Sequence, residues 1–476
     1  MNFISFEFFI LLIISAVAFY SARKQQTQKL ILLLSSTVFI CFFNVLSFVV
    51  LSIFTSLNFY LLKRLSHTTI TSKSKQLYFS GIAINTALLF IYKLLQDLIS
   101  SSGIQLLEGF NNSKWILLGI GFYSIQVIGF YFDIYKRKQL FTLKPIDFSL
   151  AVSFFPKLPS GPILTLKQSA NIFHDETEKI QVENIIYGIQ RILLGLFKKV
   201  VLADRLLPFV NQIFDDHNYH NGFLIYLGPF LFTLQLYFDF SGYIDIALGS
   251  ARIFNIKLPE NFLFPLRAQS IVDYWRRWHI TLVNWLTQYI FYPISFRYRK
   301  YKKKGIAIAV VCTFFVSAAW HGFAITFFIW AFCHFTYIIL ENYFQLNQHK
   351  TNTSTLIKVA RVIFVWHLIA WSNLFFRAHS LNDVKLFFKD FMKLPFFVPD
   401  SIPLKTWILN GGQNIENEFN LRLSILLCML FLVYERKITQ YAFSTKYNMY
   451  YVVAMIVFIT VFGMFNIGER FIYLQF

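Results

Sequence analysis

Long apolar stretches with few or no charged residues recur from one end of the chain to the other. About 18 to 20 apolar residues are enough for a helix to cross the hydrocarbon core of a membrane. The pattern therefore predicts an all-α polytopic membrane protein. We expect membrane-embedded helices at 3–20, 30–62 (long enough for two short helices), 77–95, 115–134, 222–250, 305–340, 356–376, 422–434 and 447–466.

The stretch Gly305–Leu340 contains no Asp, Glu, Lys or Arg. As one helix it would be about 54 Å long, which is too long for a single straight span across a core of about 30 Å. We therefore predict a break near its middle, at Trp320-His321-Gly322. An imidazole at that depth is costly unless it has a partner or borders water, so His321 is a functional candidate. The alternative is a histidine that only hydrogen-bonds between helices.

The segment Asp147–Leu164 contains three prolines and a glycine close together, which forbids a continuous helix. Non-helical backbone at membrane depth is tolerated only inside protein or beside a cavity. One interpretation is a turn at the mouth of a cavity, and the other is an ordinary interfacial loop.

The segment Asn184–Arg205 has apolar residues at helical spacing, with Arg191, Lys198 and Lys199 at other positions. This pattern predicts an amphipathic helix that lies along the membrane surface. The alternative is a bundle helix with one wet face.

Two acids interrupt the apolar stretch Tyr237–Gly249, and Ser241-Gly242 between them could break or kink the helix. Asp239 and Asp245 are six residues apart, so on one unbroken helix they would point about 120° away from each other. We expect each acid to hold a neighbouring arginine, histidine or hydroxyl. A proton relay or cation site is the alternative.

The segment Gln269–Pro293 predicts one helix capped by Ser270, with Asp273 in the capping-box position. Arg276 and His279 are expected to be neighbours on one face of that helix. Another face is apolar and rich in tryptophan, and such a helix with basic residues is typical of the membrane–water boundary. It comprises Ile271, Trp275, Trp278, Leu282, Trp285, Leu286 and Tyr289.

The composition agrees with a single membrane domain over residues 1–476. The chain is 56% hydrophobic and only 14% charged, and its net charge is +20. The basic residues form short clusters between apolar stretches, which favours topology and lipid head groups over nucleic acid as the reason for the charge. From Asp273 to Lys304 there are eight Lys or Arg and one acid, so we place this segment on the cytoplasmic side.

Neither the cysteines nor the N-terminus points to another class of protein. The four cysteines lie in apolar stretches without metal-ligand spacing, and no metal is expected. Residues 1–20 lack the basic start and the cleavage site of a signal peptide, so we expect a retained first span.

Several ordered motifs resemble the membrane-bound O-acyltransferase (MBOAT) family. The similarity is to the bacterial branch with the alginate O-acetyltransferase membrane subunit and the D-alanyl transfer protein of teichoic acid modification. The match covers most of residues 115–380. The motifs are GIGFYSIQVIGFYFDIYK (119–136), FFPKLPSGPI (154–163), GIQRILLGLFKKVVLADRL (188–206), LYFDFSGYIDIALGSARIFNIKLPENF (236–262), DYWRRWHITLVNWL (273–286), WHG (320–322) and LFFRAHS (374–380), with FIYLQF at the C-terminus.

This resemblance implies a ring of about eleven transmembrane helices, with re-entrant and interfacial helices, around a central catalytic cavity that funnels approach from both faces. It implies that His321 is the catalytic histidine and His279 the second family histidine. The acyl donor would be acetyl-CoA or an acyl-phosphopantetheine carrier protein. The expected acceptor is an extracytoplasmic polysaccharide or a partner protein, and a secreted SGNH-type transferase is an expected partner. The expected location is the bacterial cytoplasmic membrane.

Acyl transfer to a hydroxyl needs a base and a stabiliser of the tetrahedral oxyanion. A buried imidazole suits the first role because burial disfavours its charged form, so we expect His321 to be the base. His279 would orient the donor or assist proton transfer, or else make a structural hydrogen bond. The expected donor-binding residues are Arg276, Arg277, Trp278 and Asp273, although the arginines could instead meet lipid head groups. The expected cavity residues are Trp320, Gly322, Asp239, Ser241 and Tyr243.

Two other classes of protein share some of these features. A transporter or flippase would also contain broken helices and intramembrane acids and histidines. Such a protein would move an unmodified substrate, and an inverted repeat that would support it is not evident in the sequence. A structural subunit that anchors a secreted transferase would not need His321 for acylation.

Overall fold

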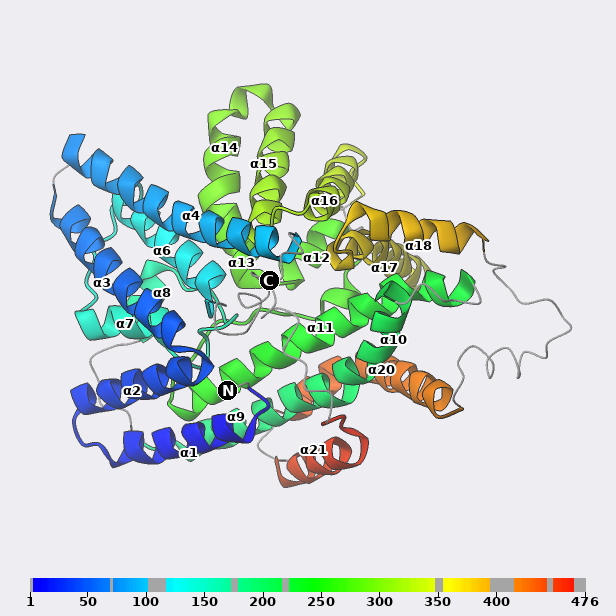
Figure 1. Cartoon of the computed structure of the whole chain (residues 1–476), viewed down its shortest axis with the longest axis horizontal. Coiled ribbons are helices and arrows are strands. Elements are labelled where there is room, and N and C mark those ends of the chain that lie inside the picture. The colour runs from blue at the N-terminus through cyan, green and yellow to red at the C-terminus, as the bar shows by residue number, and fades with distance from the viewer. Residues whose placement is uncertain are drawn as a thin grey trace, which may run out of the picture.

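The computed structural model describes residues 3–68, 72–101, 117–172, 179–215, 222–346, 354–393, 415–442 and 448–465. Within these ranges all regular elements are helices (Figure 1). Seven of the described helices are long and apolar enough to cross a membrane. They are α2 (Gln25–Phe43), α3 (Val45–His67), α4 (Ser72–Ser101), α11 (Gly222–Ile253), α15 (Lys303–His321), α16 (Ile325–Tyr343) and α17 (Thr355–Arg377). The described residues show seven candidate spans and several shorter helices, and the ring of about eleven spans stays a prediction.

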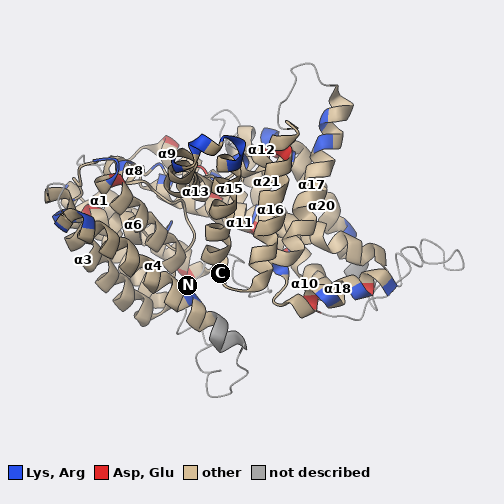
Figure 2. Cartoon of the chain, turned by 90° about the horizontal axis from the view of Figure 1, so that it is seen from above, with Lys and Arg blue, Asp and Glu red and all other residues tan. Residues whose placement is uncertain are grey.

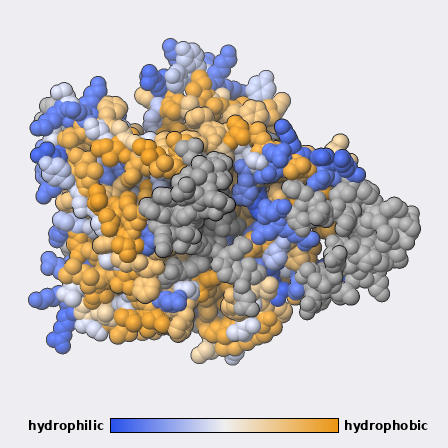
Figure 3. All heavy atoms as spheres, viewed as in Figure 1, coloured by the Kyte–Doolittle hydropathy of each residue, from blue (hydrophilic) through white to orange (hydrophobic). Residues whose placement is uncertain are grey.

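The N-terminal helices form one side of the molecule (Figure 1). Helices α1 (Phe6–Ser21), α2, α3 and α4 follow one another along the chain, and α6 (Ile120–Tyr135) packs against α3 and α4. The expectation of two helices in 30–62 is confirmed, because α2 ends at Phe43 and Asn44 caps α3 by accepting from the Ser47 amide. Large apolar side chains of this region are exposed, as Figure 3 shows, which suits contact with lipid.

Helix α9 (Val182–Leu196) packs lengthwise on α11 in the centre of the molecule (Figure 1). Two pairs of glycines, each pair seven residues apart, allow this close approach. A Cβ on Gly242 would lie 2.8 Å from the Gly195 carbonyl oxygen, and one on Gly249 would lie 2.6 Å from that of Gly188. Small residues at such contacts are typical of membrane helices. Helix α11 does not break at Ser241-Gly242, where the sequence would allow a break or a kink, and Gly242 serves the contact with α9 instead.

The prediction of a surface helix at Asn184–Arg205 is also wrong. The chain instead continues from α9 through a π-helical turn (η2, Phe197–Ala203) into α10 (Asp204–Asp215), and Arg191, Lys198 and Lys199 are buried. Arg191 and Lys198 pair with Asp245 at 3.0 and 2.9 Å, while Lys199 pairs with Asp239 at 2.6 Å. The charges that looked like a wet face are therefore compensated inside the protein, by acids on α11.

The segment 154–164 is buried throughout, between α7 (Pro145–Ser153) and α8 (Leu166–Ile172). Side chains of distant helices accept from its backbone amides. The Ser160 amide donates to the Tyr243 hydroxyl at 2.9 Å, and the Ile163 amide donates to Thr281 Oγ1 at 3.1 Å. The prediction that this segment is not a continuous helix is confirmed, and these partners replace a helix's own hydrogen bonds. A turn at the mouth of a cavity stays a prediction.

The predicted break in Gly305–Leu340 is confirmed, because α15 ends at His321 and α16 begins at Ile325. Helices α15, α16 and α17 pack in sequence order, and α18 (Leu381–Lys393) follows α17. The remaining longer helices are α20 (Ile415–Ala442) and α21 (Asn448–Phe462), and the segment FIYLQF lies outside the described residues.

Candidate functional site

His321 is the last residue of α15 and is buried where the helix stops. Its backbone carbonyl belongs to the helix terminus, where carbonyl groups lack partners within the helix. Lys93 of α4 supplies the missing donor, because its Nζ lies 2.9 Å from the His321 carbonyl oxygen and is itself buried. A lysine from the N-terminal half of the chain thus holds the backbone of the candidate histidine.

Aromatic rings surround the His321 imidazole. Its ring centroid lies 4.7 Å from that of Trp320, 4.9 Å from Phe376 and 5.6 Å from Trp330. These side chains come from α15, α17 and α16, so all three helices of the C-terminal group meet at the imidazole. Such a wall excludes water and strengthens any electrostatic interaction made inside it.

His279 lies in a second helix break, which corrects the prediction of one helix over Gln269–Pro293. Helix α12 (Ile271–Arg277) ends before it, and α13 (Ile280–Leu286) begins after it. His279 itself has a φ of 43°, which costs a non-glycine residue about 1–2 kcal/mol. Asn261 holds this turn, because it accepts from the Ile280 amide with its carbonyl and from the Thr281 amide with its side chain. His279 is therefore not on one helical face with Arg276.

Trp320 connects the two histidines. Its ring centroid lies 6.3 Å from that of His279, besides the 4.7 Å to His321. The indole Nε1 donates to the Gly121 carbonyl at 3.0 Å, and Phe122 contacts both Trp320 and His279. The structure thus brings His321, His279 and Trp320 into one buried aromatic cluster, with Gly322 at the helix break beside it.

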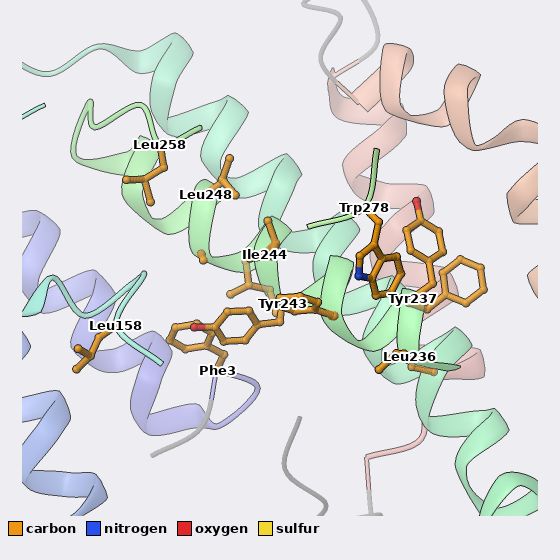
Figure 4. Packing of buried hydrophobic residues seen from close by; sticks show 14 of the residues in the cluster. Phe3, Leu158, Leu236, Tyr237, Tyr243, Ile244, Leu248, Leu258 and Trp278 are labelled. Atoms are coloured by element: carbon orange, nitrogen blue, oxygen red, sulfur yellow. The ribbon is translucent and has the colours of Figure 1, made fainter. Parts of the chain in front are cut away.

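The expected donor-binding residues on α12 divide into two groups. Arg276 is exposed, and Arg277 is partly exposed and pairs with Asp273 at 2.7 Å. Trp278 is buried and stacks on Tyr274, so it belongs to the core (Figure 4). The predicted cap is confirmed, since the Asp273 amide donates to Ser270 Oγ at 3.0 Å.

Three expected cavity residues lie on α11, where two of them have structural partners. Asp239 forms the buried pair with Lys199, so the expectation of a neighbouring cation is met by a lysine. Tyr243 accepts from the Ser160 amide and stacks on Phe3 with a centroid distance of 4.8 Å (Figure 4). Ser241 is buried one residue after Phe240, whose ring centroid lies 4.9 Å from that of His279.

Among the described residues, no group of three His, Cys, Asp or Glu could hold a metal ion.

The sequence reasoning missed Lys93, Asn261 and Phe376. Lys93 carried a usable signal, because a lone lysine inside a predicted span is costly unless another group pairs with it. Asn261 and Phe376 carried none, because their roles depend on contacts between segments far apart in the chain.

Comparison with known proteins identifies a family and several relatives of the chain. Residues 136–380 match the model of the membrane-bound O-acyltransferase family. The chain is 30% identical to a peptidoglycan O-acetyltransferase of Helicobacter pylori, over 74% of this chain and 71% of that one. It is 29% identical to a probable alginate O-acetylase of Azotobacter vinelandii, over 69% and 65%. It is 30% identical to a teichoic acid D-alanyltransferase of Bacillus subtilis, over 41% and 51%.

Proposed function

Because the chain belongs to the membrane-bound O-acyltransferase family and is an O-acyltransferase, we propose that it moves an acetyl group from a cytoplasmic thioester to a hydroxyl beyond the membrane. His321 is the general base in this proposal. The observation that carries it is the buried end of α15, where His321, His279 and Trp320 form one cluster.

The proposed reaction is a direct acyl transfer. The acceptor oxygen attacks the thioester carbonyl carbon while His321 takes the hydroxyl proton. The tetrahedral oxyanion then collapses, the C–S bond breaks, and the leaving thiolate receives the proton that His321 took from the hydroxyl. The products are an ester and a free thiol. His279 orients the donor or assists the proton transfer, and the aromatic wall excludes water that would hydrolyse the thioester.

The donor side of the proposal rests on Arg276 and Arg277. The exposed Arg276 and the partly exposed Arg277 lie on α12, and a cluster of basic residues follows in the sequence at 297–304. A thioester of coenzyme A or of a carrier protein brings phosphate groups, which guanidinium groups bind well. Reversing both charges (Arg276→Glu, Arg277→Glu) should raise KM for the donor about tenfold or more while the protein still assembles. An unchanged KM would assign these arginines to lipid head groups.

The acceptor side follows from the relatives, which are named for peptidoglycan, alginate and teichoic acid. We infer an extracytoplasmic polysaccharide, reached directly or through a secreted SGNH-type partner, at the cytoplasmic membrane of a bacterium. The alternative of a transporter or flippase has no comparable support, since these relatives are all named for group transfer.

The test uses the full chain in lipid vesicles with radiolabelled acetyl thioester. The His321→Ala variant should lose at least about 100-fold in turnover to any acceptor, because general-base catalysis contributes about 10²–10⁴. The matched control is His367→Gln, which alters a histidine of α17 that interacts with Tyr226 of α11. A His321→Ala variant that turns over as fast as the wild type would contradict the proposal.

A further inference from the structure

A cavity of about 200 Å³ lies between the ends of α10, α17 and α18. Its lining combines charged and polar groups with aromatic rings. The residues that matter here are Phe214, Asp215, Arg377, His379, Asp383 and Phe387. Its volume is below the roughly 300–1,000 Å³ of drug-sized sites, so it suits one small polar group such as a sugar ring.

The cavity borders the wall around His321. Arg377 lines it, while the preceding residue, Phe376, contacts the His321 imidazole with a centroid distance of 4.9 Å. Thr326, just after the helix break, donates from Oγ1 to the Ala378 carbonyl at 3.2 Å, and this bond fixes the end of α17 against the start of α16. The cavity and the aromatic wall around His321 thus share the C-terminal end of α17.

The cavity lies at the opposite end of the helices from the basic cluster. Helix α15 starts at Lys303, beside that cluster, and ends at His321, while α17 ends at Arg377 near His321. Figure 2 shows α9 and α12 along one edge of the molecule and α10 and α18 along the opposite edge. Because positive residues favour the cytoplasmic side, the cavity faces the side where a polysaccharide would be.

The polar groups of the cavity offer both donors and acceptors. Arg377 donates to Asp215 at 2.6 Å and contacts His379 Nε2 at 3.2 Å. A guanidinium can only donate, so Nε2 of His379 accepts and the ring proton of a neutral His379 sits on Nδ1. Carboxylates accept several hydrogen bonds each, so Asp215 and Asp383 have capacity beyond the bonds that they make here. This arrangement matches neighbouring hydroxyls, which donate and accept at once.

Aromatic rings supply the apolar side of the cavity. Phe214 and Phe387 stack with a centroid distance of 5.5 Å, and the Arg377 guanidinium lies 5.5 Å from the Phe214 centroid. The C–H faces of a sugar ring pack well on such rings, since both surfaces are apolar and rigid.

The charge of the lining selects among glycans. Asp215 and Asp383 carry two negative charges and Arg377 one positive charge, which leaves −1 when His379 is neutral. The exposed lysines of α18, Lys385 and Lys389, are not among the lining residues. A net negative cavity repels a uronate or a phosphate, whereas it accepts a neutral sugar.

We propose that this cavity is an acceptor subsite that binds one neutral sugar residue of the polysaccharide, next to the residue that is acylated. The inference rests on the proposed function and narrows its acceptor from polysaccharides in general to neutral glycans.

The test measures binding of two probes to the full chain in nanodiscs by equilibrium dialysis. One probe is a neutral N-acetylglucosamine tetramer and the other an anionic mannuronate tetramer. The wild type should bind the neutral probe at least about fivefold more tightly than the anionic one. His379→Gln should weaken binding of the neutral probe about five- to tenfold, as loss of one or two hydrogen bonds predicts. Asp215→Asn should reduce the preference for the neutral probe over the anionic one, because it removes one negative charge from the cavity.

The matched control is Lys389→Gln, an exposed position on α18 outside the cavity. His321-dependent turnover of acetyl thioester, measured in the same samples, should stay unchanged in the Lys389→Gln control. Binding of neither probe, a preference for the anionic probe, or wild-type binding by both cavity variants would overturn the subsite. If the wild type turned over no more acetyl thioester than the His321→Ala variant, the proposed function would be overturned instead. The two failures are therefore distinguishable.

Discussion

At the scale of single residues, Lys93 is the least expected part of the candidate site. It is buried, and it donates to the carbonyl of the residue that we propose as the base. Substituting Lys93→Met removes that donor and leaves the end of α15 with an unsatisfied buried carbonyl, which costs about 1–3 kcal/mol. We expect a lower melting temperature and a fall in kcat with little change in KM for the donor.

Thermal unfolding and steady-state kinetics of the Lys93→Met variant would check this expectation. The control is Lys75→Met, an exposed lysine of the same helix. Equal effects of the two substitutions would show that the Lys93 contact has no special role.

The candidate histidines show how far the sequence reaches at this scale. His321 could be placed from the chain alone, because an uncharged stretch too long for one span needs a break and the break contained a histidine. His279 could be selected but not positioned. Its left-handed backbone depends on Asn261, and no periodicity in the chain reports that contact.

At the scale of elements, the contact between α9 and α11 depends on glycines, which have no side chain to keep the two helices apart. Gly242→Leu would place a Cβ 2.8 Å from the Gly195 carbonyl oxygen, so the helices would have to separate. We expect a loss of about 1–3 kcal/mol or more, as overpacking of a close contact predicts. Thermal unfolding in detergent would measure it, with Leu227→Met, a half-buried position on the same helix, as control. An unchanged melting temperature would contradict the close packing of this pair.

Most spans could be predicted from the sequence, but the partners of their charges could not. Hydropathy located α2, α3, α11 and α17 to within a few residues in most cases. The same reasoning put Asn184–Arg205 on the membrane surface, because a row of cations on a helix looks the same whether water or carboxylates face it. Only the position of α11 in the structure shows that carboxylates face these cations.

At the scale of the whole molecule, the two edges in Figure 2 predict a defined orientation. With the four native cysteines replaced, a cysteine at Lys302 should react with a membrane-impermeant maleimide only from the cytoplasmic side. A cysteine at Lys389 should react only from the opposite side. Both positions are exposed, so access to the reagent depends on the membrane alone. Labelling of both from the same side would contradict the arrangement of donor and acceptor sides.

The buried ion pairs between α9, η2 and α11 also bear on how the protein reaches the membrane. Inserted alone, each partner would bring uncompensated charges into the bilayer, at about 2.5–3.5 kcal/mol for each charge at the centre of a span. Arg191 and Lys199 meet Asp245 and Asp239 only after α11 has been synthesised, more than thirty residues later in the chain. The insertion machinery would therefore have to retain the first segment until the second arrives, and we expect these helices to enter the bilayer together.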